Sequence, residues 1–311
     1  MKATQVKAPQ DSPPAPAASP EAPPEVDEWG QKIISYYDDS WLDFKWFWLN
    51  RKNLSMHFGH YDERSRTHAK AMENTVRVMA NHLRVVPGDN VFDAGCGVGG
   101  PALWLASERG ATVSGVTLSA DQARRANRYA RKRRLDRQCQ FSAQDFRFTT
   151  FPSESFDVVW ACETIGHTRD QREFYKEAFR LLKPGGRLLI RDGYLRRRPE
   201  GDEEENLTQL WFDGWILHDL PELTQAMSWL EEVGFEEVGA TDVTVNTTPS
   251  GRRVFRFAWT LRPLSRLLTR MKIRTPVQHA NVVGSIAAWR CHQRGMVVAA
   301  MVLARKPAKG V

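Results

Sequence analysis

The sequence predicts an α/β fold built on a mostly parallel sheet of seven strands, with helices on both faces. From residue 90 to residue 194, short apolar runs alternate with longer amphipathic segments, and the connections between them are short. Strands that alternate with helices are usually joined by right-handed crossovers, which makes neighbouring strands parallel. A glycine-rich stretch also follows the first apolar run directly, which is where open α/β sheets bind ligands.

The amino-acid composition excludes several classes of protein. Hydrophobic residues make up 41% of the 311 residues and charged residues 26%, as in a soluble globular enzyme. No apolar run reaches the length of a membrane span, and the start of the chain lacks the apolar stretch of a secretory signal. The four cysteines are far apart, which argues against a disulfide framework or a zinc-thiolate site. We therefore expect a cytoplasmic enzyme with no membrane partner.

The first 61 residues divide into two parts. Residues 1–27 are rich in proline and alanine and hold almost no large apolar side chains, so we expect a disordered tail. Residues 28–311 should then form one domain. Eight aromatic residues lie between 29 and 48, at spacings that fit one or two amphipathic helices. We interpret 28–61 as a helical lid over an apolar pocket, although plain core packing or a dimer interface, and hence a homo-oligomer, stays possible for these aromatics.

The remaining elements follow in order. Strands are expected at 90–95, 112–118, 139–145, 157–162, 187–192, 236–245 and 296–304, and helices at 101–109, 120–134, 169–182 and 220–233. The motif Lys183-Pro184-Gly185-Gly186 should end the helix that precedes it. The segment 245–295 reads as a mostly helical insertion before a very apolar last strand.

The glycine-rich stretch VFDAGCGVGG ends the first strand and opens a helix. Gly95, Gly97 and Gly99 permit a tight turn and a close approach of backbone to ligand, and a helix N-terminus offers free N–H groups. A P-loop would need a GxxxxGK[ST] pattern, which is absent. The carboxylate of Asp93 suits a ligand with an ammonium group and would repel a pyrophosphate. The loop therefore favours an amino-acid-bearing nucleotide over a redox dinucleotide.

At this point the chain resembles the class I S-adenosylmethionine (SAM) methyltransferases, which have a Rossmann-like fold. VFDAGCGVGG is similar to their first motif. GVTLS, Gln144-Asp145-Phe146, FDVVW and LLKPGG follow in the same order and at similar spacing. The resemblance covers roughly residues 55–245 and the last strand, and it implies SAM as the cofactor.

The resemblance also implies which residues hold SAM. Asp93 and the backbone of Gly95, Gly97 and Gly99 would hold the methionine end. Thr117 and Leu118 follow the second strand, as in the sterol, tocopherol and cyclopropane-forming branch, and Gln122 is the candidate for the ribose. Asp145 would accept from the adenine amino group with Phe146 against the ring, and Tyr37 could reach the SAM carboxylate. The cofactor candidates are therefore Asp93, Gly95, Gly97, Gly99, Thr117, Leu118, Gln122, Asp145, Phe146 and Tyr37.

Catalytic candidates come from two segments. In the tocopherol and sterol branch a glutamate stands where this chain has Glu163, after the fourth strand, and we expect it to face the transferring methyl group. His167 ends the same segment. SMHFGHYD, residues 55–62, is similar to a segment before the first motif of that branch and supplies His57 and Tyr61. Glu163, His167 and Tyr61 are the expected catalytic residues.

The substrate is inferred from charge and aromatic content. The segment 245–295 holds ten Arg and Lys residues and no Asp or Glu, and arginine forks suit phosphate oxygens. With an aromatic cavity, this suits a prenyl diphosphate, and the chain resembles the geranyl diphosphate and related isoprenoid C-methyltransferases. We therefore expect C-methylation of an isoprenoid through a carbocation, from which Glu163 would remove a proton. The substrate-contacting candidates are Trp46, His57, Trp211, Trp215, Arg252 and Arg256.

Several alternatives stay open. A methyltransferase of the same branch could instead act on a phenolic ring, an amine or a sterol, and a catalytically silent SAM-binding module is a further class. A nucleic-acid methyltransferase is disfavoured, because the Asn/Asp-Pro-Pro-aromatic tetrad is absent after the fourth strand and the net charge of +7 is modest. No dedicated metal site is expected, and Mg²⁺ would be required only by a diphosphate substrate.

Overall fold

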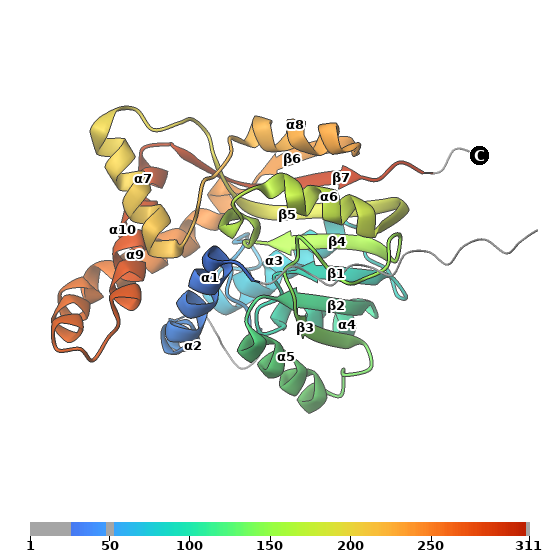
Figure 1. Cartoon of the computed structure of the whole chain (residues 1–311), viewed down its shortest axis with the longest axis horizontal. Helices are drawn as coiled ribbons and strands as arrows, with labels where there is room; N and C mark the ends of the chain where they lie inside the picture. Colours follow the sequence, from blue (N-terminus) through green and yellow to red (C-terminus); the bar gives the residue numbers. More distant parts are fainter. Residues whose placement is uncertain (1–25, 48–52, 309–311) are drawn as a thin grey trace, which may run out of the picture.

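A computed structural model describes residues 26–47 and 53–308. Apart from Val26 and Asp27, the expected tail lies outside the described residues. The described chain contains the expected seven-stranded sheet, in the order β3-β2-β1-β4-β5-β7-β6 (Figure 1). The strands are β1 (Asn90–Ala94), β2 (Thr112–Thr117), β3 (Cys139–Ala143), β4 (Phe156–Cys162), β5 (Leu182–Leu195), β6 (Glu236–Asp242) and β7 (Val297–Arg305).

Strands β1 to β5 pair in parallel, and β7 runs antiparallel between β5 and β6. The expected Rossmann-like, mostly parallel sheet is therefore confirmed. The chain moves from β1 outward to β3 and then returns to the other side of β1 with β4. Asp93 of β1 and Trp160 of β4 are register partners, so the loops that follow these two strands meet at the switch point of the sheet, where α/β proteins bind their ligands.

The described helices cover both faces of the sheet and extend past one end of it (Figure 1). They are α1 (Glu28–Asp39), α2 (Trp41–Phe47), α3 (His68–His82), α4 (Gly100–Arg109), α5 (Ala120–Arg133), η1 (Ile165–His167), α6 (Gln171–Leu181), α7 (Gly201–Trp215), α8 (Leu223–Val233), α9 (Thr244–Arg270) and α10 (Pro276–Gln293). Helices α3 and α7 were not expected from the sequence. Among the described residues, no helix combines the length and the apolar composition that a membrane crossing requires.

The core consists of two apolar layers, one on each face of the sheet. One layer packs Val76, Leu103 and Ala126 from α3, α4 and α5 against the strands. The other packs Phe174 and Leu230 from α6 and α8 against the opposite face. Alternate residues of the central strands point into the two layers, which is why β1 and β4 are apolar along nearly their whole length.

The helix before Lys183–Gly186 ends where we expected, but the strand that follows begins earlier than expected, at Leu182 and not at Arg187. The structure ends α6 at Leu181 and starts β5 at Leu182, so these four residues lie inside a long irregular strand. The pairing of β4 with β5 shifts register there, from Phe156 with Leu182 to Val158 with Arg187. Gly185 has a φ of +76°, and this left-handed conformation, which glycine adopts without penalty, allows the bulge.

Helices α7, α9 and α10 form a helical cap beyond the end of the sheet, at the left of Figure 1. Helix α9 contains Pro249 and Pro263 in its interior. Helix α10 begins with Thr275, whose side chain and that of Gln278 form a capping box. The insertion expected at 245–295 is therefore a helical hairpin, which packs against α7 and α1.

Candidate functional site

The loop between β1 and α4 has the backbone shape of a ligand cradle. Gly95, Gly97 and Gly99 have φ values of +75°, +53° and +86°, a region that disfavours other residues. A Cβ atom on Gly95 would collide with the Thr164 side chain from the loop after β4. The two loops of the switch point are thus packed together, and Gly97, Val98 and Pro101 at the start of α4 line the cavity beyond them.

Asp93 lies at the floor of this cradle. Its side chain is buried, and its Oδ2 atom has no hydrogen-bond partner among the described residues. Burial raises the pKa of Asp93 to about 7. A buried carboxylate oxygen without a partner is costly, and a ligand that brings an ammonium group would satisfy it. The residues present therefore fit the amino-acid end of SAM.

The side wall of the same cavity comes from the end of β2 and the start of α5. Thr117, Leu118 and Gln122 all line it. The Thr117 hydroxyl donates to Gln122 Oε1 over 2.7 Å, and Ser119 caps α5 by accepting from the Gln122 amide. The Gln122 side chain is thus fixed in orientation at the cavity wall, and its expected contact with the ribose stays a prediction.

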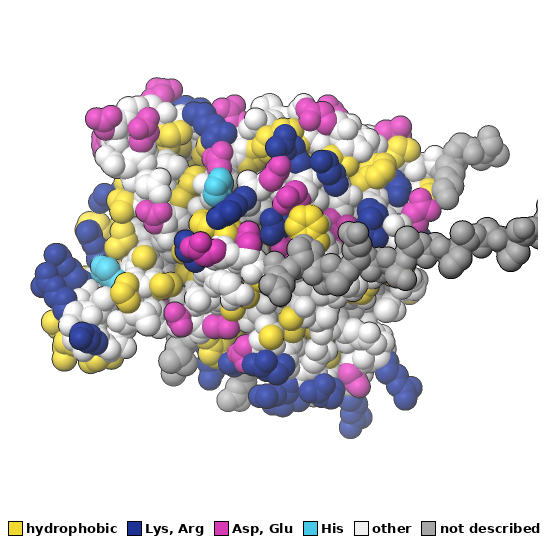
Figure 2. Space-filling view, in the orientation of Figure 1, with side chains coloured by type: hydrophobic (Ala, Val, Ile, Leu, Met, Phe, Trp, Pro, Cys, Tyr) yellow, Lys and Arg dark blue, Asp and Glu magenta, His cyan; other side chains and the backbone are white. Residues whose placement is uncertain are grey.

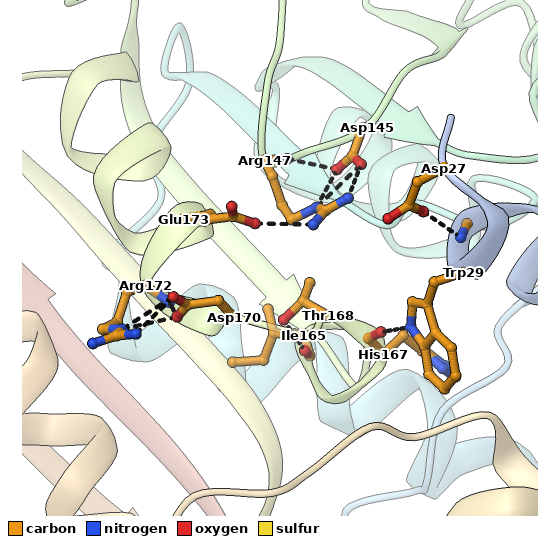
Figure 3. Close-up of polar contacts among 11 residues, drawn as sticks. Asp27, Trp29, Asp145, Arg147, Ile165, His167, Thr168, Asp170, Arg172 and Glu173 are labelled. Atoms are coloured by element: carbon orange, nitrogen blue, oxygen red, sulfur yellow. Dashed lines mark hydrogen bonds and ion pairs between the residues drawn. The ribbon is translucent and has the colours of Figure 1, made fainter. Parts of the chain in front are cut away.

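Asp145 and Phe146 complete the wall after β3. Arg147 donates to Asp145 Oδ2 over 2.6 Å and also contacts Glu173 over 2.9 Å (Figure 3). Phe146 packs edge-on against Phe174. Asp145 is therefore held rigidly, and an adenine amino group would have to share its carboxylate with Arg147.

Helix α1 closes the cavity from above. Trp29, Ile33 and Tyr37 line it from one side of the helix. Trp29 Nε1 donates to the backbone oxygen of His167 over 2.7 Å (Figure 3), and Asp38 accepts from the Ser119 hydroxyl over 2.8 Å. The lid that the sequence predicts at 28–61 thus corresponds to a helix that is hydrogen-bonded to the loops on both sides of the cofactor cavity.

A second, larger cavity adjoins the first and extends into the helical cap, with a volume of about 260 Å³. Its walls are mostly aromatic and apolar: they include Tyr36, Phe44, Phe58, Trp211, Trp215 and Trp289. Four residues line both cavities, namely Tyr37, Met56, Glu163 and His167. Any group that passes from the first cavity to the second must therefore pass these four side chains.

The Glu163 side chain is held at this junction by two contacts from different parts of the chain. Its Oε2 accepts from the Phe58 amide over 2.8 Å, and its Oε1 is paired with Arg191. Arg191 lies on β5 opposite Cys162 of β4, and its side chain is 1% exposed. It also donates to the Thr247 hydroxyl on α9. Burial raises the pKa of Glu163, and the contacts with Arg191 and Phe58 offset part of that rise. Glu163 also has a φ of +53°, which is strained for a residue with a side chain.

Tyr37 and His167 form a hydrogen-bonded pair on the other side of the junction. His167 Nδ1 donates to the Ile216 carbonyl over 3.0 Å, so Nε2 is left as an acceptor for the Tyr37 hydroxyl at 2.8 Å. Burial lowers the pKa of His167 and raises that of Tyr37. Both side chains are therefore neutral at pH 7.

Several expected site residues lie elsewhere. His57, expected at the substrate, lines the cofactor cavity, where its Nδ1 donates to the Phe58 carbonyl and burial lowers its pKa to about 3. Tyr61 lies instead against α9, where its amide donates to Asn246. Arg252 and Arg256 project into a surface groove on the outer side of α9, because the inner side of the helix carries the cavity wall. The side chain of Trp46 lies outside the described residues.

The sequence analysis missed three residues at the junction. Met56 belongs to no chemical motif. Arg191 and Asp192 end the expected strand 187–192, which reads as an ordinary buried strand and continues in the structure to Leu195. Asp192 accepts from the amides of Thr164 and Ile165, both at 3.1 Å, and so fixes the loop that carries Glu163 and His167. Burial raises the pKa of Asp192 to about 7. A charged pair, Arg-Asp, at the carboxyl end of a central strand was the available signal.

This fold and this cradle define the class I SAM-dependent methyltransferases, and the comparisons with known proteins agree. A family model described as a methyltransferase domain matches residues 92–190. The chain is 34% identical over 198 residues to the 27-O-demethylrifamycin SV methyltransferase of Amycolatopsis mediterranei, covering 63% of this chain and 72% of that protein. It is 30% identical over 256 residues to a probable chloroplastic tocopherol O-methyltransferase of Oryza sativa subsp. japonica, covering 76% and 68%. The chain belongs to this methyltransferase family.

Solved structures share the fold. A geranyl diphosphate C-methyltransferase from Streptomyces coelicolor, in complex with Mg²⁺, geranyl diphosphate and S-adenosyl-L-homocysteine, superimposes with a TM-score of 0.68 at 19% identity. The match covers 91% of this chain and all of that one. In this chain, the described residues contain no group of three or more His, Cys, Asp or Glu side chains placed to hold a metal ion.

Proposed function

We propose that the chain transfers a methyl group from SAM to an alkene carbon of an apolar isoprenoid. The observation that carries this proposal is the position of Glu163, a carboxylate at the junction between the cofactor cradle and an aromatic cavity. Bound SAM would supply an electrophilic methyl group on a sulfonium sulfur. The alkene would form a bond to that carbon as the carbon–sulfur bond breaks, which leaves a positive charge on the substrate.

The residues around the junction suit that charge. Phe58 and Trp215 pack together with ring centroids 6.1 Å apart, and Trp211 lies 5.9 Å from Trp215. Aromatic faces stabilise a neighbouring cation by about 0.5–2 kcal/mol each. The apolar walls also exclude water, which would otherwise quench the cation. Glu163 would then take a proton from the neighbouring carbon and restore an alkene.

The cavity walls define a site for the isoprenoid tail more closely than a site for its head group. Arg252 and Arg256 face away from the cavity, so a diphosphate would rely on Arg253 and Arg274, which do line it. Arg274 is already paired with Asp43 of α2. A prenyl diphosphate stays our first candidate substrate, and a neutral isoprenoid is compatible with the same walls.

A second candidate function is methylation of a hydroxyl group. The Tyr37–His167 pair supports it, because a neutral histidine acceptor behind a tyrosine hydroxyl can take a proton from a substrate hydroxyl. Of the two relatives described above, one is named as a probable tocopherol O-methyltransferase and the other as a methyltransferase of 27-O-demethylrifamycin SV. In this case the Tyr37 hydroxyl would contact the hydroxyl oxygen of the substrate. It would take up the proton that this oxygen loses and pass its own proton to His167 Nε2.

Two variants separate the candidates. The full-length protein is incubated with SAM and geranyl diphosphate, farnesyl diphosphate, a tocopherol or a sterol, and products are identified by mass spectrometry and NMR. For C-methylation, we expect Glu163→Gln to lower turnover at least a hundredfold and Tyr37→Phe to change it less than tenfold. The opposite ranking would establish the hydroxyl function and exclude Glu163 as the base.

Separate control experiments test whether each variant still folds and still binds the cofactor product. Glu163→Gln leaves the Arg191 charge buried without its partner, which can destabilise the fold by about 3–5 kcal/mol. Glu163→Asp keeps the charge but shortens the side chain, and it should also lose turnover. Calorimetry with S-adenosylhomocysteine must show that each variant still binds the cofactor product before its turnover is interpreted.

A further inference from the structure

The outer side of α9 exposes an unusual number of large apolar side chains. Phe257, Leu264, Leu267 and Met271 lie one or two helical turns apart along one stripe of the helix, and Ile273 follows in the turn to α10. Met271 is 58% exposed and Ile273 64%. We call these five residues, with the cations beside them, the α9 outer face.

The cations of this face have few carboxylates near them. Arg252, Arg256, Arg262, Arg266, Arg270 and Lys272 are all exposed. Residues 245–295 contain no Asp or Glu, and the ion pairs found for this hairpin among the described residues join Arg274 to Asp43 and Arg294 to Glu203. The pKa of His279, on α10 below the stripe, is lowered first by burial and then by Arg262, Arg266 and Arg274.

Apolar and basic side chains are mixed at the tip of the hairpin. Figure 2 shows yellow and dark blue atoms together over the α9–α10 tip at the left of the molecule, without magenta among them on this face. The exposed side of α5 is also basic, with Arg124, Arg128, Arg131, Lys132 and Arg134. Exposed large apolar residues are found on α9 and not on α5 among the described residues, so the α9 outer face differs from a simple basic surface.

We propose that the α9 outer face docks on the surface of an anionic lipid bilayer. Helices that lie in a membrane interface combine a row of Arg and Lys with large apolar residues that enter the boundary between headgroups and acyl chains. An anionic surface attracts each cation, and the attraction falls with ionic strength. A nucleic acid would attract the same cations but would leave the apolar stripe exposed to water. The proposal departs from our expectation from sequence that the protein has no membrane partner, and the vesicle experiment below decides between the two.

The docking face is continuous with the substrate cavity. Thr248, Arg253 and Phe257 line both the apolar cavity and the groove on the outer side of α9. An apolar substrate dissolved in the bilayer would therefore reach the cavity past one wall of α9. This last step rests on the proposed function, whereas the docking itself depends only on the surface of the helix.

The test measures flotation of the full-length protein with vesicles. We expect binding to vesicles of phosphatidylcholine with 30% phosphatidylglycerol, little binding to phosphatidylcholine alone, and loss of binding in high salt. The triple variant Arg262→Glu/Arg266→Glu/Arg270→Glu should reduce binding about tenfold or more. The apolar variant Leu264→Ser/Leu267→Ser/Met271→Ser should reduce it by a similar factor. None of these six residues lines the substrate cavity.

The matched control reverses an equal number of charges on α5, as Arg128→Glu/Arg131→Glu/Lys132→Glu, and should float like the unaltered protein. Circular dichroism and S-adenosylhomocysteine binding verify that every variant is folded. Equal loss in the α5 variant, full binding by the apolar variant, or tight RNA binding that only the charge variant abolishes would overturn the proposal. So would self-association through this stripe in the absence of vesicle binding. Failure of the substrate panel would leave the flotation result unaffected, so the two proposals fail separately.

Discussion

Burial in the fold brings the pKa of Asp93 close to neutral pH. Burial raises its pKa from 3.8 to about 7, so in the ligand-free protein the folded state binds a proton that the unfolded chain releases between these two values. The free energy of unfolding therefore falls as the pH rises through this window. An ammonium group beside Asp93 would favour the ionised form and lower its pKa again.

We predict that S-adenosylhomocysteine binds more tightly as the pH rises from 6 to 8, with release of a fraction of a proton at pH 7. Each pH unit below the pKa should weaken binding by up to about tenfold. Titration calorimetry in two buffers of different ionisation enthalpy measures the proton release. Asp93→Asn should bind weakly without pH dependence.

Asp192→Asn is the control for this measurement. Its carboxylate has a similar pKa, also raised by burial, but it lines the aromatic cavity and not the cofactor cavity. The variant should therefore keep the pH dependence of cofactor-product binding. If Asp192→Asn abolished the dependence and Asp93→Asn kept it, the assignment of Asp93 to the ammonium group would be wrong.

The site residues that the sequence predicted are those whose place is set by strand ends. Asp93 lies near the end of β1, and Asp145 and Glu163 follow β3 and β4 within two residues. Gln122 lies in the first turn of α5, just after β2, so the convergence of all four follows from the order of elements. The direction in which Arg252 and Arg256 point depends on how α9 is rotated about its own axis. That rotation is fixed by packing against α10 and the sheet, which a basic segment without a clear apolar periodicity does not reveal.

At the scale of elements, every strand was predicted, and the ends of all but β5, which begins five residues earlier than expected, lie within about three residues of the prediction, whereas helices were predicted less completely. The parallel strands are buried on both faces and read as continuous apolar runs between short loops. Helix α7 was missed because its first half is acidic and exposed and only its second half, with Trp211 and Phe212, is buried. The segment 245–295 was expected only to be mostly helical, and the structure divides it into α9, which continues through Pro249 and Pro263, and α10.

The contact between α7 and α10 depends on two glycines. A Cβ on Gly214 would lie 2.6 Å from the Gly284 Cα, and one on Gly284 would lie 2.8 Å from the Gly214 Cα. The helix backbones therefore touch, and this contact sets the position of Trp211 and Trp215 in the aromatic cavity. Because the nearest atoms belong to the backbone, no side-chain rearrangement could make room for an added methyl group there.

We predict that Gly284→Ala lowers the free energy of unfolding by about 1–3 kcal/mol, as overpacking usually does, although alanine is the better helix former. It should also raise KM for the substrate more than it changes cofactor-product binding. Urea unfolding and steady-state kinetics measure the two effects. Arg290→Ala, an exposed change on the same helix, is the control. Equal or greater stability of Gly284→Ala would show that the helices can separate without cost.

At the scale of the whole molecule, α1 connects the sheet to the helical cap. Toward the sheet, Asp38 accepts from Ser119 and Trp29 donates to His167. Toward the cap, the Tyr36 hydroxyl donates to Asn281 and Gln278 donates to the Asp39 carbonyl, both residues of α10. Tyr37 lines both cavities. Because α1 lines one side of the cofactor cavity, we expect that opening of this helix admits and releases a ligand of the size of SAM.

We therefore predict that α1 opens more readily than the central sheet in the ligand-free protein and is protected when S-adenosylhomocysteine binds. Ligand at one hundred times its Kd stabilises the bound form by about 2.7 kcal/mol, which corresponds to about a hundredfold slower exchange for amides that must open for release. Hydrogen–deuterium exchange with mass spectrometry should show this protection in Glu28–Asp39, while Leu223–Val233 of α8, packed on α6 away from the cavity, changes little. Equal protection of α1 and α8 would mean that the ligand stabilises the molecule globally and that α1 is not its gate.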